Sequence, residues 1–382
     1  MRTMYLLLVA LLSLFLGGCH FKDSNEILVV DVTEKYPLKK LYVQDILDLE
    51  YIPLETTSDF LTQGRILDVT ESKILMANSR SGDIFIFDRV NGKALGKINR
   101  RGEGPEEYVF LMNALADDDK NELFVYDAFR RTMLVYDMSG GFKRSFKLST
   151  EIILNKFCDF NSDYILCQNT YDQSMSQSVN SFFLLSKNDG SLTFIDIPYE
   201  KRISTSVMRK EGDMIYGNSP KNSQVVSSLE GWLLMEPSSD TIYIFQPDQK
   251  LTPFCMRIPS IQDMHPEVFL YPAALTPEYC FMQSVEKKWD FENNEGFKSN
   301  NILFDRIKGT IYRYEIYNRD FKDQEIDLSM RSFHKNIVFA ISLDPFDLIE
   351  SNNSGKLEGR LKEIASSLDE EDNPVILLAK YL

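Results

Sequence analysis

One short phrase recurs along the chain: an apolar strand ends in a polar residue, and a turn residue follows four positions later. The turn residue is Gly in four copies and Lys250 in the other. The polar residues are 49, 49, 60 and 59 positions apart. The copies are 84–88 with Gly92, 133–137 with Gly141, 182–186 with Gly190, 241–246 with Lys250, and 302–305 with Gly309.

The chemistry of the phrase predicts a β-hairpin. A short polar side chain ends the strand by bonding to nearby backbone, and Gly supplies the positive φ that a tight loop requires. Further strand candidates precede each copy, for example 65–69 and 73–77 before the first. Three or four antiparallel strands in each unit of 49 to 60 residues are typical of propeller blades.

The two ends of the chain supply a last blade. Residues 336–343 and 375–382 read as strands, and so do residues 26–32. We expect the N-terminal strand at 26–32 to complete the last blade and close the ring, which leaves no open edge. Leu residues at helical spacing predict a short amphipathic helix over 356–368. The predicted fold is all-β: residues 26–382 form a single six-bladed β-propeller domain with this C-terminal helix.

The first nineteen residues have the order of an export signal. Arg2 precedes an apolar run over 4–16, which ends at Gly17, Gly18 and Cys19. A membrane-spanning helix needs about 20 apolar residues, so this run is too short to be one. We expect residues 1–18 to be a cleaved signal peptide, Cys19 to carry lipid, and 19–25 to be a tether.

The chain is acidic, with 42 Lys and Arg against 57 Asp and Glu and a net charge of −15. Loss of residues 1–18 would remove Arg2 alone and leave −16. Such a surface excludes nucleic acid as a partner and is repelled by anionic membranes. We therefore expect the lipid to hold a monomer in the cell envelope, at the outer membrane or facing the periplasm.

Four cysteines remain besides Cys19: Cys158, Cys167, Cys255 and Cys280. Cys158 and Cys167 flank a turn-like centre that would place them on neighbouring strands. An oxidising envelope permits a disulfide between them. Two small buried side chains explain the same pattern, and the sequence leaves both interpretations open.

Three segments carry a family resemblance: 51–56 (YIPLET), 100–108 (RRGEGPEEY) and 372–375 (DNPV). With the residues Leu16 to Cys19, which resemble a lipobox, they resemble a family of uncharacterised bacterial six-bladed β-propeller lipoproteins. Residues 101–108 are also similar to the link between blades in NHL-type repeats. The resemblance implies the fold, the export and the lipid anchor, and no activity.

The segment 100–108 is the one candidate ligand site. Arg100 and Arg101 could donate to a carboxylate or sulfate, with Glu103 and Tyr108 beside them. A Gly-Pro turn with Tyr108 as a packing anchor is the alternative. Trp232 and Trp289 could stack on sugar rings or pack between strands.

An enzyme is the less favoured interpretation. Six-bladed propellers include calcium-dependent lactonases whose channel ligands come from different blades, so local spacing does not report them. The three histidines are isolated, and no catalytic elbow or phosphate loop occurs. We expect a binding or scaffold module without a cofactor, for a glycan, a peptide or an envelope protein. The alternative is a metal-dependent hydrolase or lactonase with Ca²⁺ in the channel.

Overall fold

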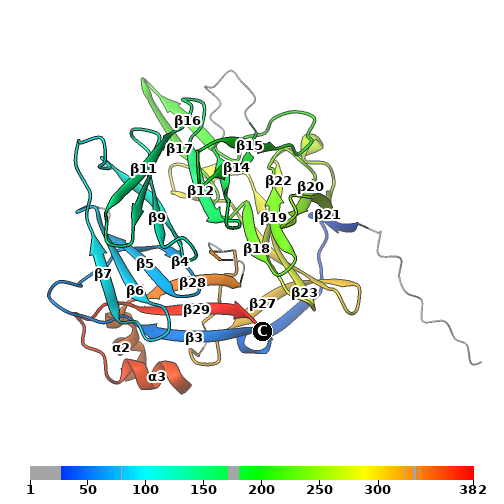
Figure 1. Cartoon of the computed structure of the whole chain (residues 1–382). Coiled ribbons are helices and arrows are strands. Elements are labelled where there is room, and N and C mark those ends of the chain that lie inside the picture. The colour runs from blue at the N-terminus through cyan, green and yellow to red at the C-terminus, as the bar shows by residue number, and fades with distance from the viewer. Residues whose placement is uncertain (1–26, 79, 171–179, 323, 330–332, 335) are drawn as a thin grey trace, which may run out of the picture.

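The chain forms a ring of six β-sheets around a central channel (Figure 1). The computed structural model describes residues 27–382 except 79, 171–179, 323, 330–332 and 335. Each sheet is a blade whose first strand lies innermost, beside the first strands of neighbouring blades. The ring has two faces, one at each end of the channel. The lower face carries the turns that join the first and second strands of the blades, and the other is the upper face.

Blades 1 to 3 are regular four-stranded antiparallel sheets built from consecutive strands. Blade 1 contains β4 (Arg65–Val69), β5 (Lys73–Asn78), β6 (Asp83–Asp88) and β7 (Ala94–Ile98). Blade 2 contains β8 (Leu111–Asp117), β9 (Glu122–Asp127), β10 (Thr132–Asp137) and β11 (Phe142–Lys147). Blade 3 contains β12 (Leu154–Asp159), β13 (Tyr164–Asn169), β14 (Phe182–Ser186) and β15 (Leu192–Ile195).

Blades 4 and 5 each have a fifth strand from the N-terminal segment, paired in parallel with the outer edge. Blade 4 contains β18 (Val225–Ser228), β19 (Gly231–Met235), β20 (Thr241–Phe245), β21 (Leu251–Ile258) and then β1 (Leu28–Asp31). Blade 5 contains β22 (Val268–Leu275), β23 (Tyr279–Glu286), β26 (Ser299–Asp305), β27 (Thr310–Tyr317) and then β2 (Leu38–Tyr42). Two hairpins stand apart from these sheets: β16 (Val207–Glu211) with β17 (Met214–Asn218), and β24 (Trp289–Asp290) with β25 (Glu295–Gly296).

Blade 6 closes the ring with strands from both ends of the described chain. It contains β28 (Ile337–Leu343), β29 (Val375–Tyr381) and, outermost, β3 (Leu47–Pro53). The prediction that an N-terminal strand completes the last blade is confirmed in kind, and a strand does form within 26–32, but its predicted place in that blade is wrong. This strand, β1, pairs with β21 of blade 4, and β3 pairs instead with β29 over seven positions.

The recurring phrase forms the hairpin between the third and fourth strands of blades 1 to 5. In three copies the predicted glycine has positive φ, for example 71° at Gly92. In the copies after Asp137 and Gln246 the turn is one residue tighter, so Gly140 and Gln249 have the positive φ instead of Gly141 and Lys250. The hairpin prediction is confirmed, and only the turn length differs.

Two helices cover the outside of blade 6 (Figure 1). α3 (Gly359–Ala365) lies within the predicted 356–368, and α2 (Pro345–Asn353) precedes it unpredicted. α2 begins at Pro345, and the Asp344 side chain accepts a hydrogen bond from the backbone N–H of Phe346. Two single-turn 3-10 helices, η1 (Val43–Asp45) and η2 (Ile261–Asp263), complete the elements of the described chain.

In the described chain, six apolar clusters lie between the six pairs of neighbouring blades, and a seventh lies under α2 and α3. Aromatic rings fill these layers; Phe85 and Phe87, for example, lie between blades 6 and 1. The chain contains 26 Phe and 18 Tyr, and rings of both kinds are buried between the blades.

Candidate functional site

A cavity of about 420 Å³ opens at the lower mouth of the channel, where the first strands of blades 1 to 4 end. We call it the lower-mouth cavity. Its volume lies within the range of about 300 to 1,000 Å³ that ligand pockets have. Among its described lining residues, none is Lys or Arg. Five carboxylates line it: Glu71, Asp117, Asp118, Asp119 and Asp159.

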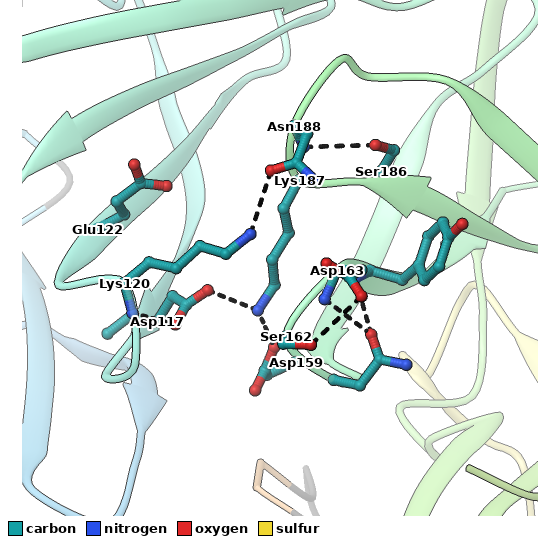
Figure 2. A network of polar contacts seen from close by, with 12 residues as sticks. Asp117, Lys120, Glu122, Asp159, Ser162, Asp163, Ser186, Lys187 and Asn188 are labelled. Atoms are coloured by element: carbon teal, nitrogen blue, oxygen red, sulfur yellow. Dashed lines mark hydrogen bonds and ion pairs between the residues drawn. The ribbon is translucent and has the colours of Figure 1, made fainter. Parts of the chain in front are cut away.

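A buried lysine lies behind this acidic wall. The Lys187 ammonium is 2.6 Å from Oδ2 of Asp117 on blade 2 and 2.6 Å from Oδ1 of Asp159 on blade 3 (Figure 2). The Lys187 side chain is only 1% exposed. A charge so far from water is tolerated only when it is paired and hydrogen bonded. We call these three residues the ion triad, and it joins blades 2 and 3 at the lower mouth.

Backbone contacts hold Lys187 in place. Its N–H donates to the Asp163 carbonyl at 2.8 Å, and its own carbonyl accepts from the Arg144 guanidinium at 2.6 Å. The next residue, Asn188, accepts from the Lys120 ammonium at 3.2 Å through its side chain (Figure 2). These contacts hold the hairpin turn against blade 2, and the Lys187 side chain points inward to Asp117 and Asp159.

A second ion cluster lies on the outer side of the triad. The Arg144 guanidinium donates to both carboxylate oxygens of Glu122, at 2.8 and 2.6 Å. These hydrogen bonds outweigh burial and, with Lys143 at 2.6 Å, lower the pKa of Glu122 to about 2. Glu122 is therefore ionised at neutral pH and fixes the arginine that holds Lys187.

Asp159 of the triad and the neighbouring Asp118 respond differently to their surroundings. Burial raises the pKa of the Asp159 carboxyl, although Lys187 opposes the shift. Burial also acts to raise the pKa of Asp118, but hydrogen bonds from Lys73, Thr70 and Ser72 on the blade 1 side bring it below its usual range. Asp159 is thus easier to protonate than an ordinary aspartate, whereas Asp118 is held as an anion that joins blades 1 and 2.

Two carboxylates at the rim of the cavity are available to a ligand. Glu71 and Asp119 are exposed, and neither has an ion-pair partner in the described part of the chain. Apolar side chains also line the cavity: Leu229 is 55% exposed, and Phe160 and Trp232 are largely buried. The cavity therefore combines anionic groups with apolar surface.

The predicted ligand segment 100–108 lies elsewhere, on the upper face before β8. Tyr108 is fully buried, donates to the Gly82 carbonyl at 2.5 Å and accepts from the Arg100 N–H at 3.1 Å. Arg101 is exposed and donates to the Arg80 carbonyl. These contacts favour the packing interpretation of Tyr108.

The charged residues of that segment are likewise held by internal contacts. The Glu103 carbonyl accepts from Arg130 at 2.7 Å, and Arg130 also donates to the carbonyls of Gly104 and Glu107. The Arg100 guanidinium is 3.9 Å from Glu106. Anion binding at Arg100 and Arg101 stays a prediction. The segment and the lower-mouth cavity are at opposite ends of β8, so they do not form one site.

Two predicted sites remain: the disulfide between Cys158 and Cys167, and the lipid on Cys19. Cys158 and Cys167 are free and buried, and they belong to core clusters on opposite faces of blade 3, so the disulfide alternative is wrong and the buried small side chains are found. Cys19 lies outside the described residues. No group of three or more His, Cys, Asp or Glu in the described chain is arranged to hold a metal ion.

Of the tryptophans, Trp232 packs between blades 3 and 4 and also lines the cavity. Trp289 lies 5.2 Å from the Phe297 ring.

Apart from Trp232, the sequence interpretation missed the residues of this cavity, although two signals were present. Asp117, Asp118 and Asp119 form a run of three acids just after an apolar strand. Lys187 occupies the second position of the recurring turn, which predicts an exposed side chain rather than a buried one. Neither signal identifies its partner, because Asp117 and Lys187 are 70 positions apart.

Comparison with known proteins gives a family. The domain of unknown function DUF4934 matches residues 27–380. The chain belongs to the DUF4934 family. No functionally curated protein matches this DUF4934 chain.

Two solved structures are similar to the DUF4934 chain. A protein from Bacteroides fragilis, named as an exported protein, has a TM-score of 0.62 at 16% identity, over 90% of this chain and 99% of that one. A member of the DUF4221 family from Bacteroides vulgatus has a TM-score of 0.47 at 10% identity, over 88% and 99%. The first similarity supports the propeller fold. No helix among the described residues is long and apolar enough to span a membrane.

Proposed function

We propose that this DUF4934 propeller is a lipid-anchored binding module of the cell envelope whose lower-mouth cavity takes a cationic ligand. The observation that carries the proposal is the charge of the cavity. Asp117 and Asp159 share the buried Lys187, whereas Glu71 and Asp119 have no cationic partner in the described chain. An ammonium or guanidinium group at the rim would supply that partner.

The shape of the cavity supports an organic cation. An ammonium on an aliphatic stem can place its charge at the acidic rim and its methylenes against Leu229 and Trp232. The blades that carry the carboxylates are fastened to each other by the ion triad and by Asp118, so the site is largely preformed. Polyamines and basic peptide side chains have this chemistry.

Binding of spermidine tests the cavity. We expect calorimetry at low ionic strength to detect spermidine binding that weakens as salt is added. Two unit charges at 4 Å interact by about 1 kcal/mol in water, so loss of both rim carboxylates in Glu71→Gln/Asp119→Asn should cost about 2 kcal/mol and weaken binding about thirtyfold. The matched control is Glu370→Gln/Glu371→Gln, which removes two exposed carboxylates far from this cavity. An equal loss in both double variants, or no binding to the parent, contradicts the proposal.

Two observations support the lipid anchor: the sequence of residues 1–19 and the position of β1. The export signal ends in the lipobox-like segment from Leu16 to Cys19, and β1, nine positions after Cys19, lies on the outer edge of blade 4. A lipid on Cys19 would therefore be attached outside the ring. The similar Bacteroides fragilis protein is named as exported, which agrees with this location.

Substitution of Cys19 tests the anchor. We expect the parent to incorporate an alkyne-labelled fatty acid and to sediment with membranes in its bacterial host. Cys19→Ser should lose the label and appear in the soluble fraction, because without acyl chains an acidic protein has little attraction to an anionic membrane. Cys158→Ser, which changes a buried thiol, should keep both properties. Labelled, membrane-bound Cys19→Ser protein would refute the assignment.

A further inference from the structure

A second polar pocket lies on the upper edge of blade 5. Two adjoining cavities of about 440 and 380 Å³ share Asn300, Asn301 and Arg313 in their walls. These residues lie toward the upper ends of β26 and β27, whereas the lower-mouth cavity is at the opposite ends of the first strands. The pocket is therefore separate from the site proposed above.

Three amide side chains form a hydrogen-bonded row, and two of them, Gln283 and Asn301, line the pocket. We call Asn222, Gln283 and Asn301 the amide row. Asn222 Nδ2 donates to Gln283 Oε1 at 2.5 Å, and Gln283 Nε2 donates to Asn301 Oδ1 at 2.8 Å. Asn301 Nδ2 then donates to Glu325 Oε1 at 3.5 Å. Each amide hydrogen bonds to the next, so the direction of every carbonyl and amino group in the row is fixed.

The row keeps unused hydrogen-bonding capacity. A primary amide has two N–H donors and two acceptor lone pairs. In the described chain, Gln283 and Asn301 each use one donor and one lone pair within the row. Gln283 is 8% exposed and Asn301 is half-buried at the pocket wall. Each of these two amides therefore offers one donor and one acceptor in a fixed orientation, which reduces the ordering cost of binding.

The charges around the row nearly balance. Arg313 lies in the wall and is 3.7 Å from Glu315, and the Lys40 ammonium is 3.2 Å from the same carboxylate, while Glu325 and Asp327 line the same pocket. Two cations against three carboxylates give an ionic ligand of either sign little net attraction. A hydroxyl group both donates and accepts, so it can bond to the donor and the acceptor of one amide.

We infer that the amide row is a binding site for a neutral, polyhydroxylated ligand of the oligosaccharide class. The pocket volume lies in the range of about 300 to 1,000 Å³ of ligand sites. Together with the acidic lower mouth, this site would give the propeller a different ligand on each face.

Oligosaccharide binding tests the inference. Purified protein is titrated with maltotetraose, cellotetraose, xylotetraose and N-acetylchitotetraose at millimolar concentrations and followed by saturation-transfer NMR and calorimetry. We expect at least one sugar to bind. In Asn301→Ala its affinity should fall about tenfold or more, because ligand groups that lose a partner cost about 1 to 3 kcal/mol.

Two controls separate this site from the rest of the molecule. Asn91→Ala makes the same change in an exposed turn of the lower face and should leave sugar binding unchanged. Glu71→Gln/Asp119→Asn should also leave it unchanged, so that failure of the lower-mouth proposal does not affect this one. If no tetrasaccharide binds, or if Asn301→Ala binds as tightly as Asn91→Ala while its melting temperature is unchanged, the inference is wrong. If Asn301→Ala also lowers the melting temperature, Gln283→Met is tested in its place, because Met keeps much of the side-chain volume and removes the amide. Unchanged sugar affinity in Gln283→Met would equally refute the inference.

Discussion

Replacement of Lys187 by Met should destabilise the propeller by about 3 to 5 kcal/mol, the usual cost of removing one partner from a buried ion pair. Lys187 is 1% exposed and is the cation within 2.6 Å of both Asp117 and Asp159. Met fills much of the same volume but leaves the buried Asp117 carboxylate without its counter-ion. Guanidinium denaturation followed by tryptophan fluorescence measures the loss.

A surface lysine supplies the matched control. Lys322 is 2.9 Å from Glu358, and both side chains are more than half exposed. Lys322→Met should cost less than about 1 kcal/mol, since exposed pairs contribute little. The double variant Lys187→Met/Asp117→Leu should recover much of the loss, because a buried ion pair can be replaced by apolar residues at little cost. Equal losses from Lys187→Met and Lys322→Met would show that the ion triad does not hold blades 2 and 3 together.

The hairpins of the propeller were predictable because their causes are local. In the first copy, strand-forming residues end at Asp88, and Gly92 supplies the positive φ four positions later. The apolar strand and its turn lie within one stretch of sequence. Five such copies at blade-like spacing were enough to predict the fold, because few folds repeat a hairpin at that interval.

Three innermost strands, β8, β18 and β22, were not predicted, although β4 and β28 were, as 65–69 and 336–343. β8 contains Asn113, β22 contains Pro272 next to a bulge, and β18 has Val225 and Val226 followed by two serines. Such polar and irregular positions obscure the alternation that identifies a half-buried strand. The prediction therefore missed part of the surface that faces the channel.

The candidate sites were unpredictable for a related reason. Lys187 reads as one more polar turn residue, and only its contact with Asp117, 70 positions away, makes it a buried cation. The amide row likewise joins Gln283 and Asn301 of blade 5 to Asn222 in the segment before β18. Contacts between blades depend on how the ring closes, which local sequence does not specify. The segment 100–108 could be proposed as a site because its charged residues are neighbours in the sequence. In the structure those neighbours form a turn that Tyr108 holds through backbone contacts.

Deletion of residues 375–382 should abolish cooperative unfolding of the propeller. β29 is the central strand of blade 6, and without it β28 and β3 lose their shared partner and the ring opens. Val375, Ile376, Leu377 and Leu378 are each at most 3% exposed. Burial of one such side chain contributes about 1.5 to 3 kcal/mol, so the four together match the total stability of about 5 to 15 kcal/mol of an ordinary protein.

Deletion of residues 27–31 is the control that separates ring closure from the loss of any strand. β1 pairs in parallel with the outer edge of blade 4 and buries Val30 completely, whereas Val29 is 40% exposed. Its loss should lower stability by about 2 to 3 kcal/mol and leave one sharp calorimetric transition. Because β3 and not β1 completes blade 6, the two deletions should differ in cooperativity as well as in melting temperature. A sharp transition after deletion of 375–382, or a broad one after deletion of 27–31, would show that blade 6 is not where the ring is closed.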